Sequence, residues 1–390
     1  MHLTREEERF LNGEHGEALR LAMEVLVRVG EAMGAESMVP ISHAHVSGVS
    51  YFSIGDYGVE LLEELALKGA KVRVFTTANP SSMALAPDFM DRFGARYVEK
   101  QHRIIELLLS MGVHESFTCI PYILRTPRQG EHLAWAESSA VLYANSVLGA
   151  YTNREGGVVA LMAGIAGRTY MAGVHLREFR VPRTLVRVAG SVKSRVIAGL
   201  LGLRIGAMSS GIPFVEFRGV SPADMPIGAV KQMLAAVGTA SDLPMVVLEG
   251  VTPGYREYRR CADFVDRHTI RVEELVSELG REEGRGDVYI TGCPHLDLEE
   301  LKELAELVVR GVFDGYKEIW VALSPKVYRL GEELGIVQKL RELGVRFAVG
   351  ACPVVTKLRL LGVEAVATDS AKAYSYIPKI SGVTAVLRGW

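Results

Sequence analysis

The chain is poor in the residues that mark several protein classes. It has four cysteines among 390 residues, too few for the disulfide framework of a secreted protein, so we expect a reducing, cytoplasmic setting. A formal net charge of -2 offers no excess of basic residues for binding nucleic acid or an anionic membrane. The most apolar stretch, residues 156–167, is too short to span a bilayer. With 48% hydrophobic residues, this composition indicates a soluble globular protein.

Amide side chains are also scarce. The chain has four asparagines and four glutamines, a weak signature of thermophilic proteins. We expect each remaining asparagine to have a specific role, and two of them, Asn145 and Asn153, lie in one short stretch. Asn79 comes between a predicted strand and Pro80, so it either turns the chain or faces a ligand at the end of the strand.

Strand-like and helix-like segments alternate along much of the chain. Its length favours two or three domains, which we expect at residues 1–134, 135–280 and 281–390. The alternation is clearest in the last of these and predicts an α/β fold with doubly wound parallel sheets. The strands expected there cover residues 287–291, 318–323, 345–349 and 364–368.

Three of the four cysteines lie at turns with a proline one or two residues later. Cys293 and Cys352 follow predicted strands, and Cys119 has a similar, looser setting. Ligands of open α/β sheets gather at the carboxyl ends of the strands. Three thiolates there could hold an iron–sulfur cluster and leave one iron open to a substrate oxygen. The alternative is that these cysteines are small buried hydrophobes, since the chain has no C-x-x-C motif. Cys261 is expected to be structural.

Two polar stretches are further candidates for a site. His43, His45 and Ser47 lie in a predicted loop after a strand, where the histidines are either a metal pair or parts of a satisfied polar loop. Residues 151–157 form a second polar loop that ends in two glycines. It could bind an anion or be an ordinary solvated loop.

The cysteine turns and three other stretches together resemble the aconitase X family. The resemblance covers essentially the whole chain, and residues 144–157 are its most specific part. These stretches are His43-Ala44-His45-Val46-Ser47-Gly48, Ala144-Asn145-Ser146-Val147-Leu148-Gly149-Ala150-Tyr151-Thr152-Asn153-Arg154-Glu155-Gly156-Gly157 and Asp369-Ser370-Ala371-Lys372.

The resemblance implies an aconitase-like multi-domain catalytic region and a hydro-lyase activity. The reaction implied is dehydration of (R)-5-phosphomevalonate to trans-anhydromevalonate 5-phosphate in the archaeal modified mevalonate pathway. The implied cofactor is a [4Fe-4S] cluster held by Cys119, Cys293 and Cys352, although the cluster type varies within the family. The resemblance also implies a separate small subunit, the swivel domain, without which we expect this chain to be nearly inactive.

The implied chemistry is a Lewis-acid dehydration. An open iron would stabilise the departing hydroxide while a base removes the α-proton. That base comes either from the small subunit or from Glu137 or Glu155, which could instead orient the reacting groups. We expect the loop of Arg154 to line the substrate crevice, and Arg154 and Lys372 to hold the carboxylate and phosphate. The substrate-binding residues predicted are His45, Ser47, Asn79, Asn145, Asn153, Arg154, Ser370 and Lys372.

Two other functions compete with this one. The first is dehydration of cis-3-hydroxyproline or another small hydroxy acid. The second, outside the enzymes, is a zinc- or nucleotide-binding scaffold. Colour separates the classes, because anaerobically purified protein should be brown with a cluster and colourless with zinc.

Overall fold

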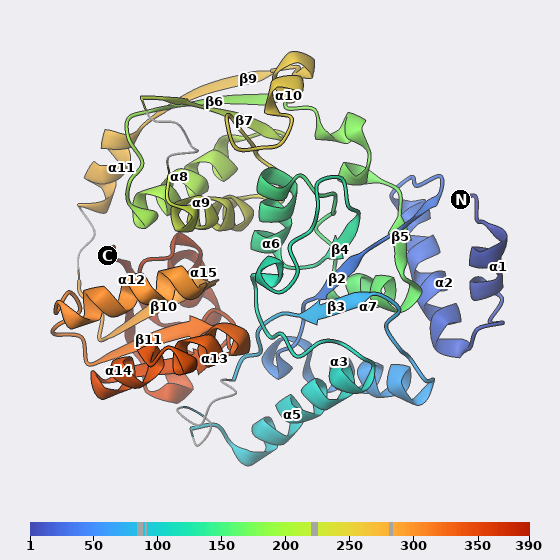
Figure 1. Cartoon of the computed structure of the whole chain (residues 1–390), viewed down its shortest axis with the longest axis horizontal. Coiled ribbons are helices and arrows are strands. Elements are labelled where there is room, and N and C mark those ends of the chain that lie inside the picture. The colour runs from blue at the N-terminus through green and yellow to red at the C-terminus, as the bar shows by residue number, and fades with distance from the viewer. Residues whose placement is uncertain (84–88, 90–91, 220–224, 281–283) are drawn as a thin grey trace.

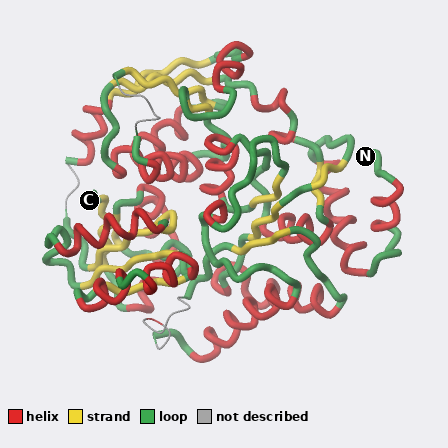
Figure 2. Tube along the Cα trace, in the orientation of Figure 1, coloured by secondary structure: helices red, strands yellow, loops and turns green. Residues whose placement is uncertain are grey.

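The computed structural model describes residues 1–390 except 84–88, 90–91, 220–224 and 281–283. In the described part the strands form four sheets, three of them parallel, and helices cover the sheets (Figures 1 and 2). The predicted α/β class is therefore confirmed. No helix in these residues combines the length and apolar composition needed to cross a membrane.

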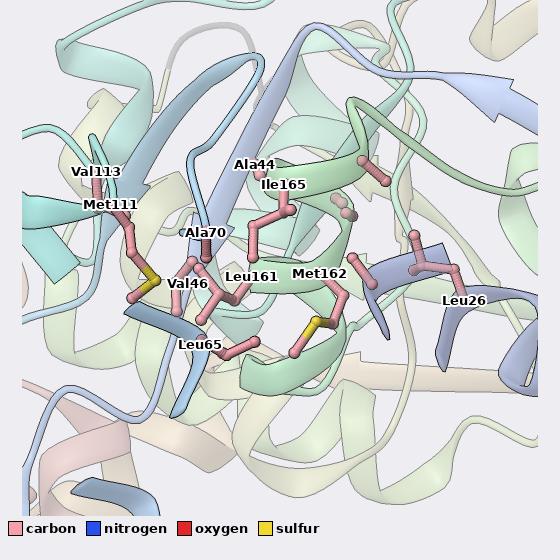
Figure 3. Packing of buried hydrophobic residues seen from close by; sticks show 14 of the residues in the cluster. Leu26, Ala44, Val46, Leu65, Ala70, Met111, Val113, Leu161, Met162 and Ile165 are labelled. Atoms are coloured by element: carbon pink, nitrogen blue, oxygen red, sulfur yellow. The ribbon is translucent and has the colours of Figure 1, made fainter. Parts of the chain in front are cut away.

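The N-terminal region is built on the parallel sheet β3-β2-β4. A two-stranded antiparallel pair, β1 with β5, lies beside it. Helix α7 packs against α2 and β2, and its Leu161, Met162 and Ile165 enter the core (Figure 3). The elements are α1 (Arg5–Leu11), α2 (Glu17–Ala32), β1 (Met38–Pro40), β2 (His43–Val46), α3 (Tyr51–Leu67), β3 (Phe75–Ala78), α5 (Ala95–Ser110), η1 (Pro121–Ile123), β4 (Leu133–Trp135), α6 (Ser138–Tyr143), η2 (Ala144–Leu148), α7 (Gly157–Ala166) and β5 (Arg168–Tyr170).

The middle region is a parallel sheet in the order β8-β7-β6-β9, backed by α8 and α9. Gly202 and Gly206 of α8 let the two helices approach closely, because a Cβ at either position would collide with the backbone of α9. The elements are η3 (Gly173–His175), η4 (Arg177–Arg180), β6 (Thr184–Ala189), α8 (Arg195–Met208), β7 (Pro213–Arg218), α9 (Ile227–Ala240), β8 (Val247–Leu248), α10 (Tyr255–Cys261), β9 (Asp266–Arg271) and α11 (Val272–Leu279).

The C-terminal region is a doubly wound parallel sheet in the order β12-β11-β10-β13-β14, drawn in orange and red in Figure 1. The four predicted strands are found, although β10 extends further than expected, and the fifth strand, β14, was not predicted. The elements are β10 (Val288–Leu296), α12 (Leu298–Val309), β11 (Glu318–Leu323), α13 (Pro325–Glu333), α14 (Ile336–Glu342), β12 (Val345–Val349), η6 (Leu358–Leu361), β13 (Ala365–Thr368), α15 (Ala371–Ser381) and β14 (Thr384–Leu387).

One local expectation was wrong. The histidine stretch is not a loop, because β1 ends at Pro40 and the chain enters the parallel sheet as β2 at His43. After β4, the chain continues as α6 and the π-helix η2, which stops at Gly149 in the left-handed conformation. The division of the chain at residues 134 and 280 stays a prediction.

Candidate active site

A cavity of about 240 Å³ lies between the N-terminal and C-terminal sheets. Its walls come from the segments that follow β3, β4 and β12, from the last part of β10 and from α15. The carboxyl ends of parallel strands therefore converge on it, as expected for a crevice site in an α/β fold. Eight of the residues that line it matter for the chemistry, namely Asn79, Cys119, Glu137, Ser138, Cys293, His295, Cys352 and Lys372.

The thiols of Cys119, Cys293 and Cys352 all line this cavity. Cys293 follows Gly292, whose φ of 96° marks the point where the pairing of β10 with β11 becomes irregular. The amide of Cys352 donates to the carbonyl of Ser81 at 2.9 Å. Three segments far apart in the sequence thus bring their sulfurs to one place.

Burial makes these sulfurs costly to ionise without a cation. It raises the pKa of Cys293 to about 12, and the neighbouring Cys352 adds to the effect. Burial likewise raises the pKa values of Cys119 and Cys352. Thiolates are the form that binds metals, so a metal group in the cavity would add positive charge to that of Lys372 and favour their ionisation.

The thiols are a ligand type that metal groups use. Among the described residues, no group of three or more His, Cys, Asp or Glu side chains could hold a single metal ion. Cysteine thiolates are the usual ligands of iron–sulfur clusters. The three thiols that line the cavity therefore suit such a cluster by their chemistry.

Glu137 and Lys372 form an ion pair in the wall of the cavity. The Lys372 Nζ donates to Glu137 Oε1 at 2.5 Å, and each side chain is 13% exposed. Glu137 also caps the N-terminus of α6 through the amide of Ser139. Burial opposes its ionisation, but Lys372 and a hydrogen bond from Asn79 outweigh that effect and lower the pKa of Glu137 to about 2. The carboxylate is therefore charged at neutral pH.

A chain of hydrogen bonds leads from β2 to this carboxylate. The Asn79 amide donates to Glu137 Oε2 at 2.8 Å, so its oxygen accepts from His45 Nε2 at 2.8 Å. The other ring nitrogen of His45 then accepts from Thr77 Oγ1 at 2.7 Å, and Thr77 accepts from His43 Nε2 at 2.8 Å. Burial lowers the pKa of His45 to about 4, which agrees with a neutral ring. The two histidines fix Glu137 indirectly and are committed to Thr77, so they do not form the metal pair that was one alternative.

His295 is a cavity residue that the sequence interpretation missed. Its amide donates to Cys119 Sγ at 3.2 Å, and its ring contacts Thr118 and Ala351. Burial lowers the pKa of His295 to about 4, so the ring is neutral. Its place directly after the Cys293-Pro294 dipeptide was the only local signal in the sequence. Thr77 was missed as well, because nothing beside it in the sequence indicates its two histidine partners.

Four predicted site residues lie in the stretch 144–157 and do not line the cavity. Asn145 bonds Thr152 and the carbonyl of Pro244, and Asn153 bonds Ala172 and Val174. These contacts join the N-terminal region to the middle region. Neither asparagine lines the cavity, so their expected position in a substrate crevice is not what the structure shows.

Arg154 and Glu155 also differ from expectation. The guanidinium of Arg154 donates to the carbonyls of Ser241 and Gly238 at the end of α9, at 2.6 and 3.2 Å. Glu155 is 6% exposed and accepts from the hydroxyl of Tyr170 at 2.6 Å. Neither lines the cavity. Burial and tertiary partners explain the polar character of this stretch.

Two further predicted binding residues, Ser370 and Ser47, lie outside the cavity lining. Ser370 is buried and caps α15, where its hydroxyl accepts from the amide of Ala373, so it positions the helix that carries Lys372. Ser47 lines a neighbouring apolar cavity of about 190 Å³ instead. Cys261 is exposed on α10, away from the other cysteines.

The fold and the cavity define a class: an α/β protein with three thiols and a Lys–Glu pair where its parallel strands end. Models of the first, second and third domains of aconitase X match residues 1–178, 182–280 and 286–390. The chain belongs to the aconitase X family.

Named relatives agree with this placement. The phosphomevalonate dehydratase large subunit of Aeropyrum pernix is 43% identical over 97% of this chain and 96% of its own length. The protein of the same name from Methanothermobacter thermautotrophicus is 38% identical over 100% and 97%. A cis-3-hydroxy-L-proline dehydratase of Pseudomonas aeruginosa is 34% identical over 95% of this chain but only 66% of its own length.

A solved structure shares the whole fold. The crystal structure of Thermococcus kodakaraensis aconitase X in its holo form superposes with a TM-score of 0.90. It is 35% identical and covers 100% of this chain and 97% of its own. The three regions described above are therefore arranged as in that protein.

Proposed function

We propose that this chain is the large subunit of a cytoplasmic iron–sulfur hydro-lyase. Its substrate is (R)-5-phosphomevalonate and its product trans-anhydromevalonate 5-phosphate, in the modified mevalonate pathway of archaea. The observation that carries the proposal is the convergence of three thiols on one cavity beside a Lys–Glu pair. The names of the full-length relatives support the substrate.

Cys119, Cys293 and Cys352 hold a [4Fe-4S] cluster in this proposal. Their three thiols line one cavity, and thiolates are the ligands that such clusters use. When bound, the cluster supplies a Lewis acid that stabilises the departing hydroxide. The chain's own side chains bind and orient the substrate next to it.

Lys372 binds the substrate carboxylate. Its ammonium lies in the cavity wall, and burial, which disfavours its charge, is outweighed by Glu137, so the pKa of Lys372 is raised. Glu137 is a weak base, because a pKa of about 2 lies far below the operating pH of a cytoplasmic enzyme. Its role is to hold Lys372 and Asn79 in place, and the base that removes the α-proton belongs to the small subunit.

The small number of cations in the cavity also supports a partner subunit. The substrate carries a carboxylate and a phosphate, whereas Lys372 is the one Lys or Arg among the described residues that line the cavity. Further cations must come from elsewhere to hold the phosphate. A small swivel-domain subunit that closes over the cavity would supply them and exclude water. The relatives named as large subunits support such a partner.

Anaerobic co-expression with the small subunit tests the proposal. The purified complex should be brown, contain iron and sulfide, and dehydrate 5-phosphomevalonate much faster than cis-3-hydroxyproline. The large chain alone should be nearly inactive. A colourless complex without iron and sulfide, or one that prefers hydroxyproline, would refute the proposal.

A further inference from the structure

His295 contacts all three cysteine turns. It lies two residues after Cys293 on the same strand, and its amide donates to Cys119 Sγ at 3.2 Å. Its Nε2 bonds the carbonyl of Ala351, the residue before Cys352, at 2.9 Å. Its Nδ1 bonds the hydroxyl of Thr118, the residue before Cys119, at 3.2 Å. One residue therefore joins three segments that the sequence separates by more than fifty residues each.

The chemistry of the partners fixes the proton on the ring. A carbonyl oxygen can only accept, so Nε2 carries the hydrogen and donates it to Ala351. Nδ1 forms its hydrogen bond with the hydroxyl of Thr118 at 3.2 Å. The same hydroxyl oxygen accepts from the amide of Ile120 at 3.2 Å, which sets the direction of its own hydrogen. Every polar group of the imidazole is thus matched.

The backbone of His295 is held from the other side as well. Its carbonyl accepts from Lys231 Nζ at 2.9 Å. Lys231 belongs to α9 of the middle region and is 4% exposed. It also contacts Glu300, which forms a capping box with Asp297 at the start of α12. The position of His295 is consequently fixed by two regions of the molecule.

The turn before Cys119 has a strained backbone that neighbouring contacts must stabilise. Phe117 has a φ of 34°, a left-handed conformation that a bulky residue rarely adopts. A strained turn persists only where its surroundings determine it. The bond from Thr118 to His295 is one of these determinants, and it lies one residue from the thiol.

We infer that His295 is a positioning residue that sets the spacing of the three cysteine thiols. The inference rests on the proposed function, because only that function gives the spacing of the three thiols a purpose. The backbone amide of His295 also donates to the sulfur of Cys119, and hydrogen bonds to the sulfurs help set the reduction potential of a cluster. Removing the ring should free the turns of Cys119 and Cys352 and leave the exposed Cys261 unaffected.

Thiol alkylation of the metal-free protein tests the inference without any cluster. In His295→Leu, Cys119 and Cys352 should react at least about tenfold faster than in the wild type, since two buried hydrogen bonds are lost. Cys261 serves as the internal standard. His175→Leu is the matched control, because His175 is equally buried but bonds His132 away from the cavity. Unchanged rates at both cysteines in a folded His295→Leu would overturn the inference.

Two further variants guard against a folding defect. Thr118→Val removes one hydroxyl and should accelerate alkylation of Cys119 by a smaller factor. His295→Gln retains a donor near the position of Nε2 and should restore part of the protection of Cys352. If His295→Leu does not fold, wild-type rates in Thr118→Val would overturn the inference.

Reconstituted protein separates this inference from the proposed function. His295→Leu should release iron to a chelator faster than the wild type and show an altered electron paramagnetic resonance signal. A wild type that binds no iron and sulfide would refute the proposed function, while the alkylation rates would still decide the role of His295. Wild-type iron release and an unaltered signal in His295→Leu would count against the inference.

Discussion

Two buried polar regions of this molecule differ in where their polar groups point. In the stretch 144–157, side chains bond backbone groups of neighbouring segments, as Asn145 does with Thr152 and Pro244. Around the thiol cavity, side chains bond one another and still line an open space, as Glu137 and Lys372 do. Apart from Glu155 Oε1, which is buried without a hydrogen-bond partner, the buried side chains of the first region are satisfied by the fold itself, and the second region keeps groups available for a ligand. Burial and polarity alone do not distinguish the two.

The two regions each contain a buried carboxylate, and the pKa values of the two carboxylates differ. Glu137 and Glu155 were both predicted as catalytic, and both are largely shielded from solvent. Burial raises the pKa of Glu155 to about 7, because its partners are neutral. The cation Lys372 instead helps to lower the pKa of Glu137 to about 2. Glu137 is thus kept charged by the cation that it holds in the cavity wall, whereas Glu155 has only neutral partners.

The largest effect is expected when a thiol is removed from the cavity. Cys293→Ser should lose most of its iron and lower turnover at least about a hundredfold, since a Lewis acid contributes several kcal/mol to such a reaction. Iron analysis and a dehydration assay measure both. Cys261→Ala is the control and should keep wild-type iron. Wild-type iron in Cys293→Ser would place the metal group elsewhere.

The next effect is expected from breaking the ion pair. Lys372→Met leaves the Glu137 carboxylate uncompensated, which costs about 3–5 kcal/mol of unfolding free energy for a buried pair, and it should abolish most turnover. Urea unfolding measures the loss. The control Lys302→Met breaks an exposed pair with Glu299 and should cost little.

Acid should remove the difference in unfolding free energy between the wild type and Lys372→Met. The pKa of Glu137 is about 2 in the folded chain, below its ordinary value of 4.5, so the pair stabilises the protein above pH 4.5. This contribution is lost as the pH falls from about 4.5 towards about 2. The gap between the wild type and Lys372→Met should narrow across that range. A gap independent of pH would mean that the two groups are not coupled.

A smaller effect is expected from the hydrogen-bond chain. Thr77→Val removes the hydroxyl that links His43 and His45, so Asn79 and Glu137 lose part of their support. Turnover should fall about tenfold, which corresponds to roughly one hydrogen bond, while iron content stays unchanged. Thr76→Val is the neighbouring control, because its hydroxyl bonds only its own segment at Val74. Equal losses of turnover in the two variants would mean that the hydrogen bonds from His43 to Glu137 do not support the reaction.

The smallest effect on turnover is expected at Arg154. Its guanidinium holds two carbonyls at the end of α9, so Arg154→Lys should destabilise the fold by about 1–3 kcal/mol. Turnover and iron content should remain close to those of the wild type. Thermal unfolding and kinetics of the same preparation decide between this role and the substrate-binding role that the sequence suggested. A strong loss of turnover at unchanged stability would restore the latter.

The sequence predicted those features that local patterns determine. The alternation of strand-like and helix-like segments predicted four of the five strands of the C-terminal sheet. The turns with a proline one or two residues after the cysteine indicated the three cavity cysteines. Partners distant in the sequence could not be predicted in this way. Nothing near Arg154 shows that its acceptors lie at the end of α9, and nothing near Thr77 shows that it joins two histidines. Such contacts depend on how the sheets pack.

The predictions for the two asparagines were right about a specific role but wrong about the partner. Asn145 and Asn153 were selected because asparagine is scarce in this chain, and both do have specific partners. Those partners are backbone groups, which a fold needs as much as a ligand does. His295 was passed over because a single histidine after a Cys-Pro turn has no distinctive spacing. Its importance follows from three turns that only the folded chain brings together.

The central claim is that the cavity, not the 144–157 stretch, is where the reaction takes place. Turnover of Glu137→Gln and Glu155→Gln, measured in the complex at equal iron content, tests it most directly. Glu137→Gln should lose more than about tenfold in rate, because a charged hydrogen bond worth about 1.5–3 kcal/mol is removed. Glu155→Gln should retain near-normal turnover, because an amide oxygen can still accept from Tyr170. The opposite ranking of the two variants would contradict the account.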